Sequence, residues 1–362
     1  MNSSKTFQSN WNSSPGDTIS DILLERQIKL EIFAKNINCS AKEATKLLNG
    51  DIVISSDLAK KLESALGASR EFWLKRELNY RSNIIRLNKL EEQAWLKELP
   101  LKDMTKFGWL KESKDTLKAC LNYFSVPDIP SWRRKYMQEI ELVSFRSSNT
   151  YPSGLGAVSA WLRQGEIQIE SIVCEDWNED LFENTLVNIR PLTRKKNPKD
   201  FIPEIIHECA KCGVAVAFVR TPSGCRISGA TKFISSRRAL LLLSFRYLSD
   251  DHFWFTFFHE AGHILLHPKD SVFLEEINKD NIRNQQEDDA NYFAGEILIP
   301  YELESQLSKI RGNKRRIIEF ASKAGVSPGI VVGQLQHRGY IDFKYLNGYK
   351  RRYNWDDILQ KI

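Results

Sequence analysis

The chain has no long hydrophobic run and few cysteines for its 362 residues. Its apolar stretches, such as ALLLLS from Ala239 to Ser244, have the length of a strand, far short of the roughly 18 residues of a membrane span. The six cysteines are scattered, so a disulfide framework is not indicated. The opening stretch MNSSKTFQSNWNSSPGD lacks the apolar core of a signal peptide. We therefore expect a reduced, cytoplasmic protein without a membrane partner.

The chain also lacks a strong charge of either sign. Its 52 Lys and Arg residues against 46 Asp and Glu residues give a net charge of +6, which permits contact with nucleic acid without arguing for it. With 42% hydrophobic and 27% charged residues, the composition is that of an ordinary soluble protein with real cores. The length predicts two or three domains.

Residues 15–81 show a dense helical pattern. Apolar residues recur at helical spacing through ISDILL and LEIFAKNI. Ser40 can cap a short helix, SAKEATKLLNG, that Gly50 ends, and Ser55 opens another that stops at Gly67. Short capped helices joined by tight turns predict a helix-turn-helix, whose second helix would enter a DNA major groove.

The segments PGDTISDILLERQIK, AKEATKLLNGD and SSDLAKKLESALGASREFWLKRELNY resemble the XRE-type helix-turn-helix domains of HigA-like antitoxins and repressors. The resemblance implies operator DNA as a partner, and it places five residues at the groove-facing surface: Ser40, Lys42, Glu43, Thr45 and Lys46. Residues 1–82 contain 12 basic and 10 acidic side chains, so charge alone does not predict a phosphate-binding surface. The alternatives are a solvated helix face or a module for homodimerisation or partner binding.

The middle of the chain, residues 84–200, predicts further helices and contains no catalytic pattern. TRKKNPKD at residues 193–200 is basic and rich in turn formers, and it marks a boundary. We predict four segments: a disordered N-terminus at 1–15, a helix-turn-helix domain at 16–82, a helical connector at 83–200 and a last domain at 201–362.

The last domain contains the segment with the clearest chemistry, WFTFFHEAGHILLH at residues 254–267. On a helix, His259 and His263 lie on one face and Glu260 about 100° away. This HExxH pattern supplies two zinc ligands and a glutamate beside the metal-bound water. Zinc lowers the pKa of that water to about 7. Glu260 would accept its proton as the water attacks a peptide carbonyl.

A zinc site of this type needs a third protein ligand, and His267 continues the histidine series. It lies about 12 Å from His259 along a helix axis, whereas two nitrogens on one zinc are at most about 4 Å apart. No glycine between residues 263 and 267 would break the helix. We therefore place His267 at the helix end, where it supports the site without binding metal.

A better source of the third ligand is QQEDDANYFAGEILIP, residues 285–300, which predicts a second helix with one apolar face. Glu287 is the leading candidate, with Asp288 and Asp289 as rivals. Asn291, one turn after Glu287, can orient a ligating histidine. Alternatively, the three acids only complement the positive end of the helix dipole.

Together the two segments resemble the ImmA/IrrE family of zinc metallopeptidases, whose pattern reads HExxHxLLH and then ExEANxFAxxLLMP. The resemblance implies one Zn²⁺ held by His259, His263 and Glu287, with Glu260 as the general base. Asn291 occupies the family's asparagine position. Asp289 replaces the second glutamate and ILIP replaces LLMP, and neither change removes a catalytic group. Family members cleave or inactivate XRE-type repressors, which implies a protein substrate.

We predict a mostly α protein with a small β-sheet (α+β). It has an all-α helix-turn-helix, a helical connector and a zincin-like metallopeptidase domain whose sheet comes from residues 213–245. The predicted function is a DNA-binding transcriptional regulator fused to a zinc metallo-endopeptidase. It would cleave a repressor-type protein, or itself, in a stress, mobile-element or toxin–antitoxin response. The alternative is a non-catalytic antitoxin or repressor that neutralises a paired toxin and has a structural or sensory metal site.

Overall fold

A computed structural model of the chain describes residues 12–144, 154–269, 272–276, 285–310 and 312–358. The chain divides into two compact units, Met1–Trp95 and Leu96–Ile362. Most of the N-terminal segment predicted to be disordered lies outside the described residues. None of the helices within the described ranges is both long and apolar enough to cross a membrane. The four-segment division drawn from the sequence stays a prediction.

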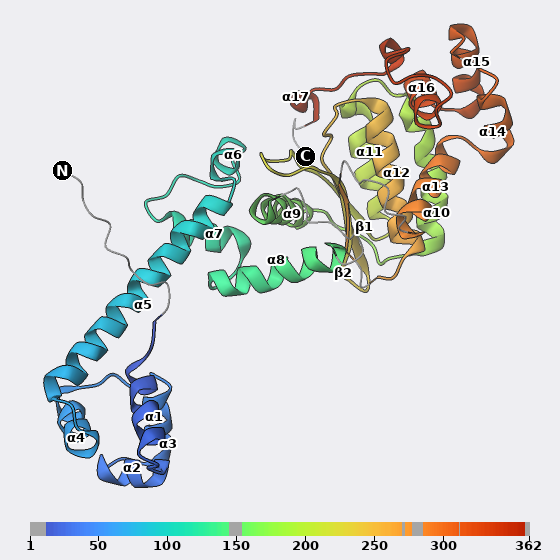
Figure 1. The fold of residues 1–362 in the computed structure, drawn as a ribbon. Coiled ribbons are helices and arrows are strands. Elements are labelled where there is room, and N and C mark those ends of the chain that lie inside the picture. The colour runs from blue at the N-terminus through green and yellow to red at the C-terminus, as the bar shows by residue number, and fades with distance from the viewer. Residues whose placement is uncertain (1–11, 145–153, 270–271, 277–284, 311, 359–362) are drawn as a thin grey trace, which may run out of the picture. The chain divides into compact units, whose positions relative to one another are not determined.

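The first unit is built from short helices whose ends follow local sequence signals (Figure 1). α1 (Pro15–Glu25), α2 (Leu30–Asn36), α3 (Ala41–Leu48) and α4 (Ser56–Leu66) are followed by α5 (Arg70–Glu98), which ends in the second unit. Ser14, Ser40 and Ser55 each cap a helix by accepting a hydrogen bond from the backbone N–H three residues on. Because α2 and α3 share the buried core around Phe33 and Leu47, they form the predicted helix pair.

The second unit is an α+β fold around one small mixed sheet, as predicted. Its strands are β1 (Val214–Phe218), β2 (Ile227–Ser235), β3 (Arg238–Leu243) and β4 (Val272–Glu276). They lie in the order β1-β3-β2-β4, with β1 and β3 parallel and the other pairs antiparallel. The first three lie in the range expected from the sequence, whereas β4 was not expected.

Helices cover both faces of this sheet. α9 (Leu155–Ile169) packs on one face, and α11 (Pro198–Ala210) and α12 (Asp250–Leu266) pack on the other. The remaining elements of this unit are α6 (Leu101–Lys106), α7 (Thr116–Phe124), α8 (Ile129–Ser144), α10 (Glu179–Ile189), η1 (Arg190–Arg194), α13 (Gln285–Leu298), α14 (Tyr301–Leu307), α15 (Lys314–Ala324), α16 (Pro328–His337), η2 (Asn347–Tyr349) and α17 (Trp355–Ile358).

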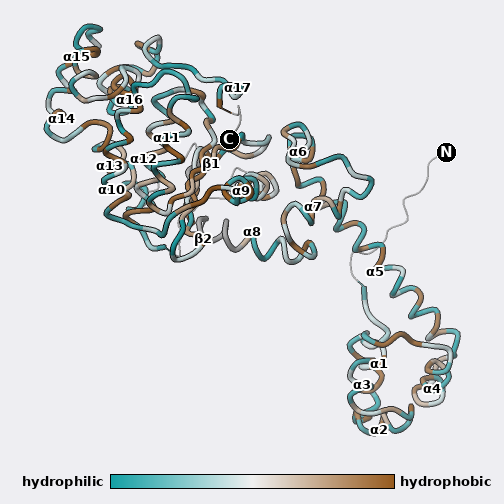
Figure 2. The backbone as a smooth tube through the Cα atoms, turned by 180° about the vertical axis from the view of Figure 1, so that it is seen from behind, coloured by the Kyte–Doolittle hydropathy of each residue, from teal (hydrophilic) through white to brown (hydrophobic). Residues whose placement is uncertain are grey.

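Alternate residues of the central strands enter two different cores. Val214 and Leu241 belong to the cluster shared with α10, α11 and α12, whereas Ala215 and Leu240 pack with Trp161 of α9. This double burial explains why the sequences of β1 and β3 are continuously apolar rather than alternating. The tube through β1 is accordingly brown in Figure 2.

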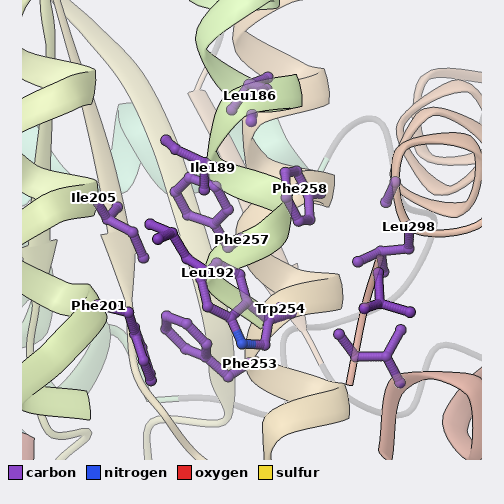
Figure 3. Packing of buried hydrophobic residues seen from close by; sticks show 14 of the residues in the cluster. Leu186, Ile189, Leu192, Phe201, Ile205, Phe253, Trp254, Phe257, Phe258 and Leu298 are labelled. Carbon is purple, nitrogen blue, oxygen red and sulfur yellow. The ribbon is translucent and has the colours of Figure 1, made fainter. Parts of the chain in front are cut away.

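The larger core buries the apolar face of α12 and so fixes the position of this helix. Trp254, Phe257 and Phe258 of α12 are fully buried and lie among side chains of α10 and α11, including Ile189 and Phe201 (Figure 3). A helix whose apolar face is fixed in this way presents its opposite face at a defined angle. The orientation of the HExxH residues therefore follows from packing on the other side of the helix.

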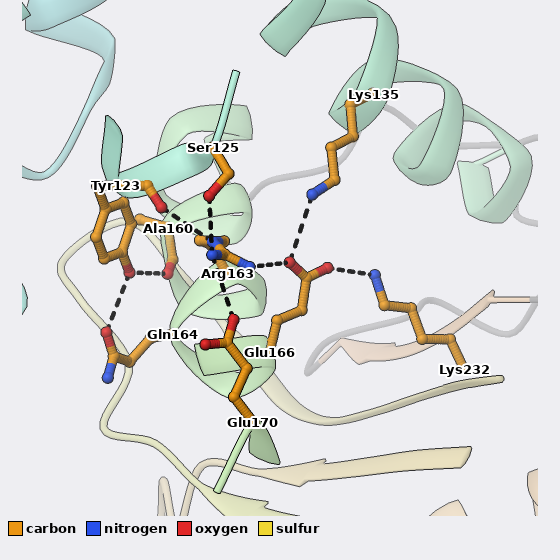
Figure 4. A network of polar contacts seen from close by, with 9 residues as sticks. All are labelled: Tyr123, Ser125, Lys135, Ala160, Arg163, Gln164, Glu166, Glu170 and Lys232. Carbon is orange, nitrogen blue, oxygen red and sulfur yellow. Dashed lines mark hydrogen bonds and ion pairs between the residues drawn. The ribbon is translucent and has the colours of Figure 1, made fainter. Parts of the chain in front are cut away.

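On the sheet face that α9 covers, a group of charged side chains joins three elements (Figure 4). Glu166 of α9 accepts hydrogen bonds from Lys232 of β2 at 2.7 Å, from Arg163 at 3.0 Å and from Lys135 of α8 at 3.4 Å. The side chains of Glu166 and Lys232 are 13% and 10% exposed. Burial raises the pKa of Glu166, but the charge of Lys232 and these hydrogen bonds outweigh it and lower the pKa.

We expect Glu166→Gln to lower the free energy of unfolding at pH 7 by about 3 kcal/mol, because an amide cannot balance the buried charge of Lys232. Urea unfolding measures the difference. The matched control is Glu170→Gln on the same helix. Its carboxylate contacts Arg163 but is 66% exposed, so the expected change is within about 0.5 kcal/mol. Equal effects of the two substitutions would contradict the assignment.

The same comparison has an expected pH dependence. Because the pKa of Glu166 is lower in the folded state, its contribution is fully present above the unfolded pKa and is lost as the pH falls through the folded pKa. The difference in stability between the wild type and Glu166→Gln should therefore shrink in acid.

Candidate metal centre

The HExxH segment lies on α12, whose first turn is anchored by buried acids. The Asp250 carboxylate accepts hydrogen bonds from Ser327 Oγ at 2.8 Å and from the backbone N–H of Arg351 at 3.0 Å. Burial raises the pKa of Asp250. Asp251 forms an ion pair with Lys350 at 2.7 Å, and both side chains are less than a tenth exposed. These contacts attach the start of α12 to the C-terminal part of the chain.

α13 packs closely along α12 because small residues face each other. A Cβ at Gly262 would lie 3.4 Å from the Cα of Ala290 and 3.0 Å from Cδ1 of Phe293. Ala290 and Ala294 are both buried. This close approach brings the first turn of α13, and with it Glu287, to the histidines of α12.

Three ligand atoms meet at this contact. His259 Nε2 lies 3.0 Å from His263 Nε2 and 3.4 Å from Glu287 Oε2, and His263 Nε2 lies 3.8 Å from Glu287 Oε1. A tetrahedral zinc with bonds of 2.0–2.1 Å needs its ligand atoms about 3.4 Å apart, so the three residues fit this ion. Within the described ranges, no other group of three His, Cys, Asp or Glu side chains has metal-ligand spacing.

The rival carboxylates do not join this group. Asp288 is exposed, and Asp289 accepts a hydrogen bond from Gln285 at 2.8 Å on the surface of α13. The geometry therefore supports Glu287 as the third ligand.

Asn291 and His267 support the group from outside. The Nδ1–H of His259 donates to Asn291 Oδ1 at 3.0 Å, a tautomer that leaves the Nε2 lone pair directed at the other ligand atoms. His267 follows the last residue of α12 with extended backbone, and its Nε2–H donates to the Gln286 carbonyl at 2.9 Å. His267 thus attaches the residue before Glu287 to the end of α12.

Phe273 and Gly229, which the sequence did not mark as site residues, also contact the site. Phe273 of β4 stacks on His263, with ring centroids 4.2 Å apart and an interplanar angle of 13°. Glu260 is fully buried and lies against Gly229 of β2, where a Cβ would come within 2.6 Å of Glu260 Cγ. Only glycine leaves room for this carboxylate beside the strand. An isolated glycine within a strand pattern was the available signal.

The five residues predicted to contact DNA are all exposed on or beside α3. Ser40 and Glu43 form a capping box, in which each side chain bonds the backbone N–H of the other. Thr45 Oγ1 donates to the Ala41 carbonyl at 3.0 Å. The local structure thus explains Ser40 and Glu43 as a helix start and leaves Lys42 and Lys46 as the cations of this face.

Comparison with known proteins first identifies the class of the metal-centre region. Residues 224–336 match the family described as the IrrE N-terminal-like domain, Peptidase_M78. The matched segment contains α12, α13 and every residue of the three-ligand group. The predicted resemblance to ImmA/IrrE-type metallopeptidases is confirmed for this part of the chain.

The second similarity is to a transcriptional regulator. The chain is 33% identical over 60 residues, 17% of its length, to the uncharacterised HTH-type transcriptional regulator YddM of Escherichia coli (strain K12). The chain spans 64% of the length of that relative. The two similarities together fit the predicted joining of a helix-turn-helix to an ImmA/IrrE-type domain.

We expect Gly229→Ala to displace the Glu260 carboxylate while leaving the three ligand atoms in place. The variant should retain the zinc content of the wild type but lose about 1–3 kcal/mol of stability through overpacking. Metal analysis and chemical unfolding measure the two effects. The control is Gly154→Ala, where an added Cβ meets no described atom within 4 Å. Loss of zinc from Gly229→Ala alone would contradict this role.

Proposed function

We propose that the chain is a DNA-binding regulator whose second unit is a zinc-dependent endopeptidase. The observation that carries the proposal is the meeting of His259, His263 and Glu287 beside a buried glutamate, within residues matched to a peptidase family. Each of the three offers an atom that zinc accepts, at tetrahedral spacing. Three protein ligands leave a fourth position for water, which distinguishes a catalytic site from a closed structural one.

In the proposed reaction, His259 Nε2, His263 Nε2 and the Glu287 carboxylate would hold the metal. Bound zinc would lower the pKa of a water molecule and polarise the peptide carbonyl. Glu260 takes one proton from the attacking water as oxygen bonds to the carbonyl carbon. It then delivers this proton to the leaving nitrogen as the C–N bond breaks, so that water is consumed and two chain ends form. Asn291 keeps His259 in the ligating tautomer throughout.

We expect about one zinc per purified chain, reduced at least tenfold in Glu287→Ala and unchanged in Asp289→Ala. The reason is that, among the acidic side chains of the described residues, Glu287 is the one that reaches both histidines. Glu260→Gln should retain the metal and cleave a casein substrate at least about 100-fold more slowly, because it lacks the base. A wild type that binds no zinc under zinc-replete conditions would overturn the peptidase proposal.

The proposed substrate is a repressor-type protein or the chain itself, in a stress, mobile-element or toxin–antitoxin response. The similarity to a transcriptional regulator and the helix pair α2–α3 support a link to gene control. The alternative, a non-catalytic antitoxin with a sensory metal site, is distinguished by Glu260→Gln. If this variant keeps the biological activity in full, hydrolysis is not the function.

For the first unit, we propose that α3 contacts operator DNA through Lys42, Thr45 and Lys46. Lys42→Ala and Lys46→Ala should each reduce the slope of log affinity against log salt by about 1, because each removes one phosphate contact. Binding to the DNA upstream of the coding sequence is measured by fluorescence anisotropy. Lys75→Ala, an exposed cation on α5, is the control. Equal slopes for the wild type and all three variants would contradict the DNA contact and indicate that this face of α3 is only solvated.

A further inference from the structure

A pocket opens beside α12, towards the N-terminal side of the metal ligands. It has a volume of about 110 Å³. Its walls include Phe255, Leu298, Ile330 and Phe343, with His252 and His337 beside them. We call it the Phe343 pocket. Phe343 is 69% exposed, whereas Leu298 and Ile330 are buried, so the side of the pocket that Phe343 forms faces solvent.

The pocket continues the line of the metal ligands. Phe255 precedes His259 by four residues, one helical turn, and the two rings stack with centroids 6.2 Å apart and an interplanar angle of 30°. On α13, Leu298 follows Asn291 by seven residues and therefore lies on the same face two turns on. Both helices thus contribute residues to the metal group and, one or two turns away, to the pocket.

This spacing matches the repeat of an extended peptide. Four residues of helix advance about 6 Å, and two residues of an extended strand advance about 6.6 Å. A peptide with its scissile carbonyl at the metal centre can therefore place the side chain of a residue one or two positions away in the pocket.

The pocket wall is preformed and its charges are balanced. Lys350 pairs with Asp251 at 2.7 Å and donates to Gln336 Oε1 at 2.6 Å. The amide nitrogen of Gln336 donates to the carbonyls of Phe343 at 3.2 Å and Tyr345 at 2.8 Å. These bonds hold the backbone of the wall in place, and the ion pair leaves no net charge for an ionised ligand.

We propose that the Phe343 pocket binds one apolar side chain of the peptide substrate, aromatic or branched aliphatic, one or two residues from the scissile bond. The proposal rests on the proposed peptidase function and names its substrate class. Apolar walls reward burial of an apolar side chain, whereas an ionised side chain would lose hydration without gaining a partner. Phe343 would then be a specificity-determining residue.

The first test measures binding without hydrolysis. Full-length Glu260→Gln is titrated with N-acetyl-phenylalaninamide, N-acetyl-leucinamide, N-acetyl-glycinamide and N-acetyl-aspartamide, and binding is followed by ligand-observed NMR. The phenylalanine and leucine compounds should bind most tightly. Phe343→Ala in this background should weaken their binding about fivefold, through loss of an aromatic contact. Equal binding of all four compounds, or none, would overturn the proposal.

The matched control is Tyr345→Ala. Tyr345 is 66% exposed, lies two residues from Phe343 and is not among the residues that line the pocket. Its substitution should leave the binding of the phenylalanine compound unchanged. If Tyr345→Ala weakens binding as much as Phe343→Ala does, the pocket is not the binding site.

The second test separates this inference from the peptidase proposal. A mixture of random-sequence peptides is incubated with the zinc-loaded wild type and with Phe343→Ala, and the products are sequenced by mass spectrometry. The wild type should prefer an apolar residue at one position near the cleaved bond, and Phe343→Ala should lose that preference. Cleavage without such a preference would overturn only the pocket assignment. Absence of cleavage together with absence of bound zinc would overturn the peptidase proposal itself.

Discussion

The close contact between α12 and α13 is the constraint on which the candidate metal centre depends. Two helices with ordinary side chains at their contact lie 8–10 Å apart, and glycine and alanine at the contact permit a shorter separation. Gly262 faces Ala290 and Phe293, so the first turn of α13 comes within ligand distance of α12. Glu287 completes the three-ligand group only because of this approach. A larger residue at position 262 would separate the ligands without changing any of them.

The rest of the second unit fixes the rotation and the start of α12. Trp254, Phe257 and Phe258 bury one face of the helix in the larger core, and the apolar packing leaves the histidine face directed away from it. Asp250 and Asp251 attach the first turn to Ser327 and to the segment around Lys350. Burying two adjacent acids is costly unless they are hydrogen-bonded and paired. Here each of them has such partners, so the cost is met by contacts that also define where the helix begins.

Features with short-range causes could be predicted from the sequence. The caps at Ser40 and Ser55 and the helices around HExxH follow from signals within a few residues of each element. β4 could not be predicted in this way, because a five-residue strand gains its stability by pairing with β2, some forty residues earlier in the chain. The space that Gly229 leaves for the Glu260 side chain likewise depends on a contact between residues far apart in the sequence.

Other differences arise from tertiary contacts. The exclusion of His267 as a ligand assumed a helix that continues to residue 267, whereas α12 ends at Leu266. The ring of His267 lies 5.1 Å from that of His263, centroid to centroid, and bonds Gln286. Trp161 of α9, in the segment expected to be a connector, packs on the same sheet as the metal-centre helices. Sequence pattern alone does not reveal that a helix far upstream covers the opposite face of a sheet.

The position of Glu260 bears on whether the metal centre is catalytic or structural. Its side chain is fully buried, and a carboxyl group loses hydration on burial. The fold also omits a side chain at Gly229, where glycine weakens a strand. A structural zinc site would need neither feature, since His259, His263 and Glu287 already offer three ligand atoms. A hydrolytic site requires a base beside the metal, held in a fixed position. The burial of Glu260 and the glycine at position 229 therefore both agree with the proposal that Glu260 acts on water.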